Sequence, residues 1–354
     1  MRIRRVLAIA VALAFAISAV PVEAQKKDDK KPPKRSKAEQ ADVETLVKLV
    51  DGVAGGTQPA PTDVAITWDY NHYVKGQEGV TYIPFTLSVD RSKLAGKGEV
   101  AYYVRVVPKG VPATPAAPAA ASKDNKDAKA PARPDYPWDN INFIEVPASG
   151  KVTRAIQLKS GEYEAFVAIK EKSPEKEQKN APPAKMGLLR HDLKVPDFTA
   201  NDLSTSSIMM ASNIEVLPAP LSQDKQEENP YTFGPMKVNL SPDARFSKSG
   251  ELNLVFWIYG AGAAEKGKPN VQVEYAFHQK LPEGEKYFNR TQPQVLNAES
   301  LPPEFDVAAG HQLPGTLTVP LASFPAGDYR LEIKITDKTS NKTLTQNVTF
   351  SVQA

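Results

Sequence analysis

The sequence lacks cysteine altogether and has only four histidines and three tryptophans among its 354 residues. Without cysteine there can be no disulfide framework, no lipid-modified cysteine and no thiol nucleophile. The histidines form no His-x-His or His-Glu-x-x-His pattern of the kind that binds zinc. A Gly-x-Ser-x-Gly nucleophile elbow and a glycine-rich phosphate loop are also missing. These absences predict a chain with no catalytic site, cofactor or metal. The histidines are His72, His191, His278 and His311.

An excess of one charge sign is also lacking. The chain has 44 basic and 41 acidic residues, and residues 25–354 alone have 41 and 40. Such a balance argues against nucleic acid as a partner. A local basic run, KKDDKKPPKRSK at 26–37, is typical of a solvated, disordered tail. Weak contact of this tail with an anionic surface is the alternative.

The first 24 residues resemble a signal peptide. MRIRR is a positive segment, Val6 to Val20 is apolar, and Val22-Glu23-Ala24 places small residues before Gln25. The apolar run of 15 residues is shorter than the ~20 that cross a bilayer. We therefore expect cleavage after Ala24 and a periplasmic or secreted chain without a transmembrane segment. A retained membrane anchor is the alternative.

Alternation of apolar and polar residues dominates the rest of the chain. After a short amphipathic helix within 41–56, the period changes from 3.6 to two residues. Runs at 63–70, 83–89, 271–278, 329–335 and 343–352 each bury one face, which is typical of antiparallel sheets. The run LNLVFWIYG at 252–260 is apolar on both faces and suits a central strand.

A sequence repeat indicates two similar domains. SGEYEAFVAIKEK at 160–172 matches AGDYRLEIKITDK at 326–338, and a further alternating run follows each copy. In immunoglobulin-like sandwiches a tyrosine near the start of strand F bonds back to the preceding corner. Tyr163 and Tyr329 stand where that tyrosine belongs. The sequence predicts an all-β fold of two immunoglobulin-like antiparallel β-sandwich domains.

The expected domain limits follow changes in composition. We assign 1–24 to the signal peptide, 25–60 to a disordered basic tail with one short helix, and 61–217 to the first sandwich. A Pro-, Ala- and Lys-rich loop at about 108–137 interrupts this sandwich. A linker at 218–230 precedes the second sandwich at 231–354.

Three stretches carry a family resemblance: LSTSSIMMASNIEV at 203–216, NPYTFGPMKVNLSPDARFSKSGELNLVFWIYG at 229–260, and FPAGDYRLEIKITDKTSNKTLTQNVTFSV at 324–352. They resemble the tandem immunoglobulin-like β-sandwich region of exported acidobacterial proteins, including Gly-Trp-x-Thr-Asp-domain and von Willebrand A-related proteins. The extra domains of those proteins have no counterpart here. The resemblance implies fold and export.

The sequence contains two candidate sites. Asp202-Leu203-Ser204-Thr205-Ser206 has the Asp-x-Ser-x-Ser spacing of a cation site, but a polar, proline-broken segment precedes it, so we expect an interdomain loop. Trp68, Tyr136 and Trp138 are possible ligand-contact aromatics. We expect Trp68 to face the core instead, because it has the same parity as Val64 and Ile66, and we expect Tyr136 and Trp138 to tether the loop to the sandwich.

The sequence therefore favours an exported, non-catalytic interaction or scaffold protein of the bacterial envelope. It would bind an envelope or extracellular protein through sandwich loops or edge strands. A carbohydrate- or cell-wall-binding module is the first alternative, and an unrecognised hydrolase is the second.

Overall fold

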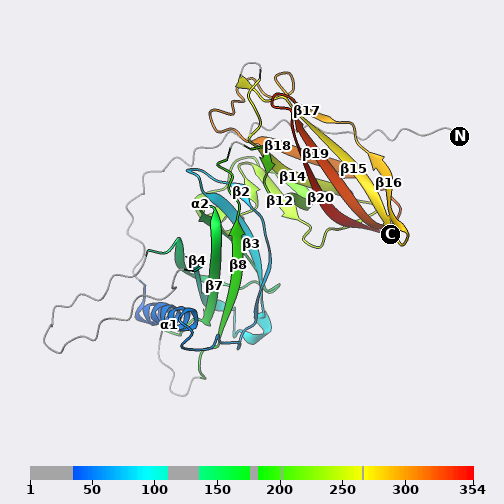
Figure 1. Ribbon diagram of the computed structural model, residues 1–354. Helices are drawn as coiled ribbons and strands as arrows, with labels where there is room; N and C mark the ends of the chain where they lie inside the picture. Colours follow the sequence, from blue (N-terminus) through cyan, green and yellow to red (C-terminus); the bar gives the residue numbers. More distant parts are fainter. Residues whose placement is uncertain (1–34, 111–134, 176–181, 201, 265–266) are drawn as a thin grey trace. The chain divides into compact units, whose positions relative to one another are not determined.

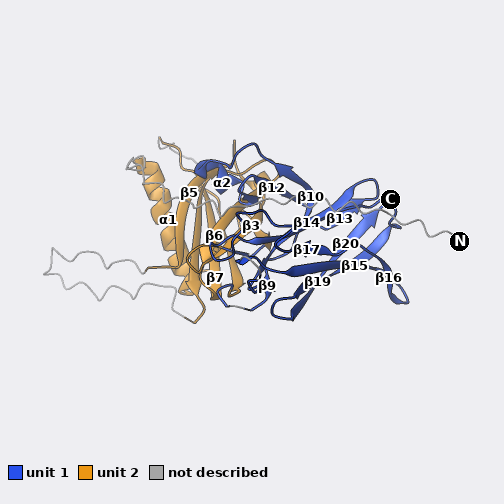
Figure 2. Cartoon of the chain, turned by 90° about the horizontal axis from the view of Figure 1, so that it is seen from above, with its two compact units in different colours: residues 1–28, 72–75, 198–354 blue, residues 29–71, 76–197 orange. Residues whose placement is uncertain are grey.

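The computed structural model describes residues 35–110, 135–175, 182–200, 202–264 and 267–354. The predicted signal peptide, the basic tail up to residue 34 and most of the predicted loop at about 108–137 lie outside these residues. The chain forms two compact units, coloured separately in Figure 2. Within the described residues, unit 2 comprises 35–71 and 76–197, and unit 1 comprises 72–75 and 198–354.

The described part of unit 2 contains one long helix, a short 3-10 helix and seven strands (Figure 1). Their bounds are α1 Lys37–Ala54, β1 Ile66–Asn71, β3 Thr81–Val89, the 3-10 helix Arg91–Lys93, β4 Glu99–Pro108, β5 Trp138–Glu145, β6 Lys151–Leu158, β7 Gly161–Glu171 and β8 Met186–Val195.

The strands of unit 2 form two antiparallel sheets. β3 pairs with both β1 and β6, and the other sheet has the order β5-β4-β7-β8. The chain crosses between sheets from β3 to β4 and from β6 to β7. Strands B to C and E to F make the same crossings in immunoglobulin-like sandwiches.

Helix α1 explains why β4 is buried on both faces. The predicted helix is present, and it begins with a capping box in which Ser36 and Glu39 bond reciprocally. Its apolar side, including Leu46 and Val50, packs with Tyr103 and Phe166 in one cluster. The residues on the opposite face of β4, which include Tyr102 and Val104, are also buried. The helix is therefore an integral layer of unit 2.

Unit 1 has a short helix and the remaining strands. Their bounds are β2 Val74–Lys75, β9 Ser204–Thr205, β10 Met209–Val216, α2 Gln223–Glu228, β11 Thr232–Phe233, β12 Met236–Leu240, β13 Arg245–Ser247, β14 Glu251–Tyr259, β15 Val271–Leu281, β16 Gly284–Arg290, β17 Gln294–Leu296, β18 Leu313–Pro320, β19 Gly327–Asp337 and β20 Lys342–Gln353.

Two sheets of unit 1 enclose one core. The first has the order β11-β12-β10-β14-β18 with β9 added to β14, and the second has the order β13-β20-β19-β15-β16 with β17 added to β15. The core draws Leu254 and Phe256 from the first sheet and Tyr275, Ile333 and Phe350 from the second. Crossings from β14 to β15 and from β18 to β19 repeat those of unit 2. One pairing differs from the antiparallel expectation, since β13 runs parallel to β20.

Both tyrosine corners are present. The Tyr163 hydroxyl donates to the Lys159 carbonyl at 3.1 Å, and the Tyr329 hydroxyl donates to the Pro325 carbonyl at 2.7 Å. Gly327, which opens β19, has φ 143°, a value that L side chains rarely adopt. The strand order and these corners establish the all-β, immunoglobulin-like class that the sequence predicted.

The units divide between Asp197 and Phe198, upstream of the expected linker at 218–230. The reason is strand pairing, because β10 pairs with β12 and β14. Residues 198–217, which composition assigns to the first sandwich, therefore belong to unit 1. Part of the expected linker forms α2, which lies within unit 1 as well.

Candidate interaction edge

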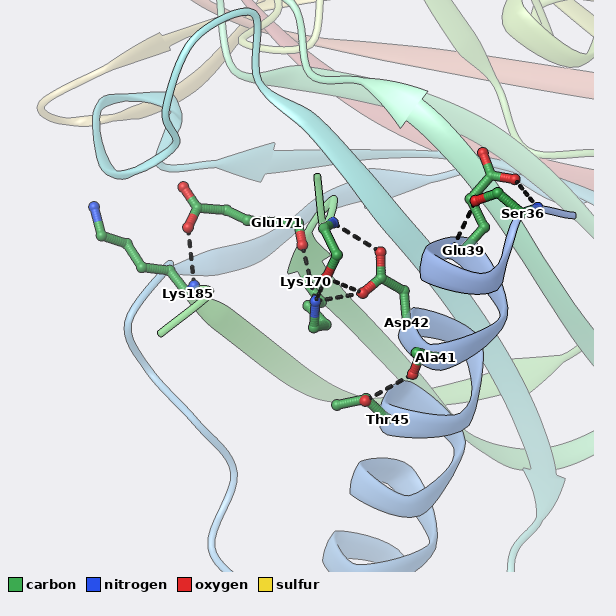
Figure 3. A network of polar contacts seen from close by, with 9 residues as sticks. Ser36, Glu39, Ala41, Asp42, Thr45, Lys170, Glu171 and Lys185 are labelled. Atoms are coloured by element: carbon green, nitrogen blue, oxygen red, sulfur yellow. Dashed lines mark hydrogen bonds and ion pairs between the residues drawn. The ribbon is translucent and has the colours of Figure 1, made fainter. Parts of the chain in front are cut away.

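The buried charges of unit 2 hold helix α1 to the sheet. Lys170 on β7 donates to the Asp42 carboxylate at 2.5 Å, to the Ser173 hydroxyl at 2.8 Å and to the Glu171 carbonyl at 3.1 Å (Figure 3). The Ser173 backbone N–H and hydroxyl also bond Asp42. All three ammonium donors of Lys170 are thus used, which identifies this network as a structural anchor.

A second anchor surrounds Arg105, whose side chain is fully buried. Its guanidinium contacts the Asp51 carboxylate of α1 at 2.5 Å and donates from Nε to the Tyr103 hydroxyl at 2.7 Å. The Tyr103 hydroxyl in turn donates to Asp139. Arg105 Nη2 has no hydrogen-bond partner within the described part of the chain. One feature of the sequence could have indicated this site, because the charged Arg105 has the same parity in its strand as Tyr103.

The possible ligand-contact aromatics are engaged in contacts of their own. The Trp68 ring stacks between Phe85 at 4.4 Å and His191 at 4.3 Å. The Tyr136 ring covers the Arg105 guanidinium at 4.4 Å, and Trp138 begins β5 half-buried. β1, which carries Trp68, contacts β8, whereas β5 is the opposite edge of the β5-β4-β7-β8 sheet. The structure therefore does not gather these aromatics into one platform.

The Asp202 pattern is used for structural contacts. Asp202 pairs with Lys342 at 2.9 Å, and Ser204 lies in β9. The Ser206 hydroxyl accepts from the Trp257 backbone N–H and donates to the Ser207 carbonyl, both at 2.9 Å. Within the described ranges no group of three His, Cys, Asp or Glu side chains is placed to hold a metal ion.

Two histidines are desolvated in separate units. Burial lowers the pKa of His72 in unit 1 to about 4, and its Nδ1 lies 3.0 Å from the Tyr231 hydroxyl. Burial also lowers the pKa of His191 in unit 2. Both imidazoles are therefore neutral at pH 7.

Strand β20 of unit 1 presents a long edge (Figure 1). It pairs with β19 from Lys342 to Val352, but β13 covers its other side only at Ser351–Gln353. Among the described residues no strand pairs with the outer side of residues 342–350. Thr343 to Phe350 contain no charge, proline or glycine. Sheet edges with these properties are templates for pairing with another chain.

Other edge strands carry features that oppose such pairing. β18 has Pro314 and Pro320, which cannot donate backbone hydrogen bonds. The edge strand β16 pairs with β15 through a register shift. At the edge strand β8, residues 61–64 already bond backbone groups. The charged residues on these strands are Glu285, Lys286 and Arg290 of β16 and Arg190, Asp192 and Lys194 of β8.

The pairing with β13 shows which backbone groups of β20 face outward. Ser351 N–H donates to the Ala244 carbonyl at 2.9 Å, and the Gln353 carbonyl accepts from Lys248 N–H at 2.8 Å. Groups of alternate residues in a strand face the same side, and the β19–β20 register has no shift. The residues of that parity in the open stretch are Thr343, Thr345, Asn347 and Thr349, all exposed.

In the residues that the structure describes, no helix has the length and apolar character needed to cross a membrane. No family model matches the chain, and no curated protein matches it.

Solved structures give weak likenesses. An immunoglobulin-like protein of Pseudomonas aeruginosa has 11% identity over 42% of this chain and 97% of its own, with a TM-score of 0.20. The trypsin-activated alpha-2-macroglobulin of Escherichia coli has 9% identity over 84% of this chain, with a TM-score of 0.22, and the match spans 17% of its length. The immunoglobulin-like class of this chain follows from its strand order and its tyrosine corners.

Proposed function

We propose that this chain is an exported, non-catalytic interaction protein of the bacterial envelope that binds an extended strand of a protein partner at the β20 edge. The observation that carries the proposal is the open stretch Lys342–Phe350, which has four outward-facing backbone residues and a single charge. Added strands of this kind gain main-chain hydrogen bonds for affinity.

Export and the absence of catalysis are parts of the same proposal. Residues 1–24 have the composition of a cleaved signal peptide. The buried charged groups of Asp42, Lys170 and Arg105 form ion pairs that hold α1 to the sheet. They are therefore unsuited to chemistry on a substrate. The tandem sandwich resemblance is to exported proteins as well.

The test is a crosslinking pull-down from envelope extracts, with residues 25–354 as bait. Thr345→Pro removes an outward N–H without removing a bond to β19, because edge strands tolerate proline where the N–H faces solvent. Thr345→Val keeps the N–H and is the matched control. Circular dichroism melts establish that both variants fold.

We expect the wild type and Thr345→Val to recover a protein partner that Thr345→Pro loses. An oligosaccharide array is run beside the pull-down. A glycan hit that disappears in Trp68→Ala or Trp138→Ala, with no protein recovered, would overturn the proposal in favour of a carbohydrate-binding module.

A further inference from the structure

The open edge of β20 is complementary to the same edge of a second copy of the chain. We infer that its partner is a second copy of this chain, paired antiparallel through residues 342–350 about a two-fold axis at Gln346. This inference rests on the proposed function, because it requires that the β20 edge binds an extended strand. A two-fold interface uses the same surface on both copies, so that surface must be self-complementary.

The backbone parity fits this register. In an antiparallel pair, two residues that both face the partner exchange N–H and C=O bonds. Centring on Gln346 sets Thr345 against Asn347 of the second copy and Thr343 against Thr349. All four outward residues of each copy then find such a partner, which gives about eight hydrogen bonds.

In neighbouring registers, fewer of the outward backbone groups find a hydrogen-bond partner on the second copy. A centre at Thr345 sets Thr349 against Asn341, which lies outside β20. A centre at Asn347 sets Thr343 against Ser351, whose N–H already bonds Ala244 of β13. The end of β13 coverage at Ser351 therefore selects the register about Gln346.

The side chains also match across the axis. On the outer face threonine meets threonine or asparagine, and on the inner face Leu344 meets Val348. Cross-strand pairs of these kinds stabilise antiparallel sheets. Lys342 is the one charged residue of the stretch, and its two copies stand at opposite ends, about 26 Å apart. No like charges therefore oppose one another in the pair.

The absence of cysteine permits a direct test in the chain from residue 25 to 354. Gln346 and its copy would form a non-hydrogen-bonded pair with Cα atoms about 4.5 Å apart, within the range of a disulfide. Gln346→Cys should therefore oxidise to a covalent dimer. Thr343→Cys is the control, because it is more exposed yet would lie about 20 Å from its copy.

Sedimentation measurements accompany the crosslinking. We expect a mass twice that of the monomer, a disulfide dimer from Gln346→Cys alone, and loss of both effects when Thr345→Pro is added. Equal crosslinking of the two cysteine variants would overturn the inference.

Two further outcomes separate the inference from the proposed function. If the protein is a monomer and the Thr345→Pro variant loses a different protein that the wild type captures, the partner is not a second copy. The proposal that the β20 edge binds an extended strand then still stands. If the protein is a monomer and the Thr345→Pro variant still captures the partner, the inference and the proposed function are both wrong.

Discussion

Removing the ammonium of Lys170 should destabilise unit 2 strongly. Lys170→Met leaves the Asp42 carboxylate, whose residue is 1% exposed, with only Ser173 as hydrogen-bond donor. Breaking a buried pair by removing one partner costs about 3–5 kcal/mol, against a total stability of roughly 5–15 kcal/mol. The melting temperature should fall by roughly 6–20 °C.

Urea denaturation of a double-mutant cycle measures this effect. Asp42→Asn with Lys170→Met removes both charges, so the double variant should be more stable than the sum of the single losses by about 1–3 kcal/mol. Lys109 and Asp192 form an exposed ion pair and give the matched control. Lys109→Met should cause a much smaller loss of stability than Lys170→Met, because solvent screens an exposed pair.

The result that would refute the reasoning is a Lys170→Met loss equal to that of Lys109→Met. Strict additivity of the two single changes at Asp42 and Lys170 would also refute it. Either outcome would mean that apolar packing alone holds α1 to β4 and β7.

Three further predictions concern other buried groups. His72 has a folded pKa of about 4 against 6.5 when unfolded, so protonation favours the unfolded chain and stability should fall between pH 6.5 and 4, by at most about 3 kcal/mol; His72→Gln should flatten this dependence in thermal melts. Arg105→Met should destabilise unit 2 by about 3–5 kcal/mol in urea, because it removes the ion pair of the guanidinium with Asp51 and its hydrogen bond to the Tyr103 hydroxyl; a loss below 1 kcal/mol would contradict this. Ile333→Asp should unfold unit 1, whereas Lys334→Asp should change stability by only about 0.5 kcal/mol, and comparable losses in circular dichroism melts would mean that both faces of β19 are covered.

Local sequence patterns predicted the features that depend on neighbouring residues. Alternation placed Ile333 inside and Lys334 outside, and the structure agrees. The Gly-acid-Tyr sequences predicted both corners because the tyrosine bonds only four residues back. The both-faces-apolar run at 252–260 is the buried strand β14, which pairs on both sides.

Features that depend on distant contacts could not be predicted. The burial of Lys170 and Arg105 depends on where α1 docks, and nothing in the local sequence specifies where an amphipathic helix docks. The same limit applies to β10, whose pairing with β14 assigns it to unit 1. The open edge of β20 follows from strand order, which alternation does not encode.

Amide hydrogen exchange at the β20 edge tests the central claim most directly. The outward N–H groups of Thr343, Thr345, Asn347 and Thr349 should exchange rapidly in dilute protein, because they bond neither β19 nor β13. Residue-resolved nuclear magnetic resonance should show these four amides becoming protected when the partner strand is bound. Protection of all four in the dilute monomer, or rapid exchange in the bound protein, would contradict the account.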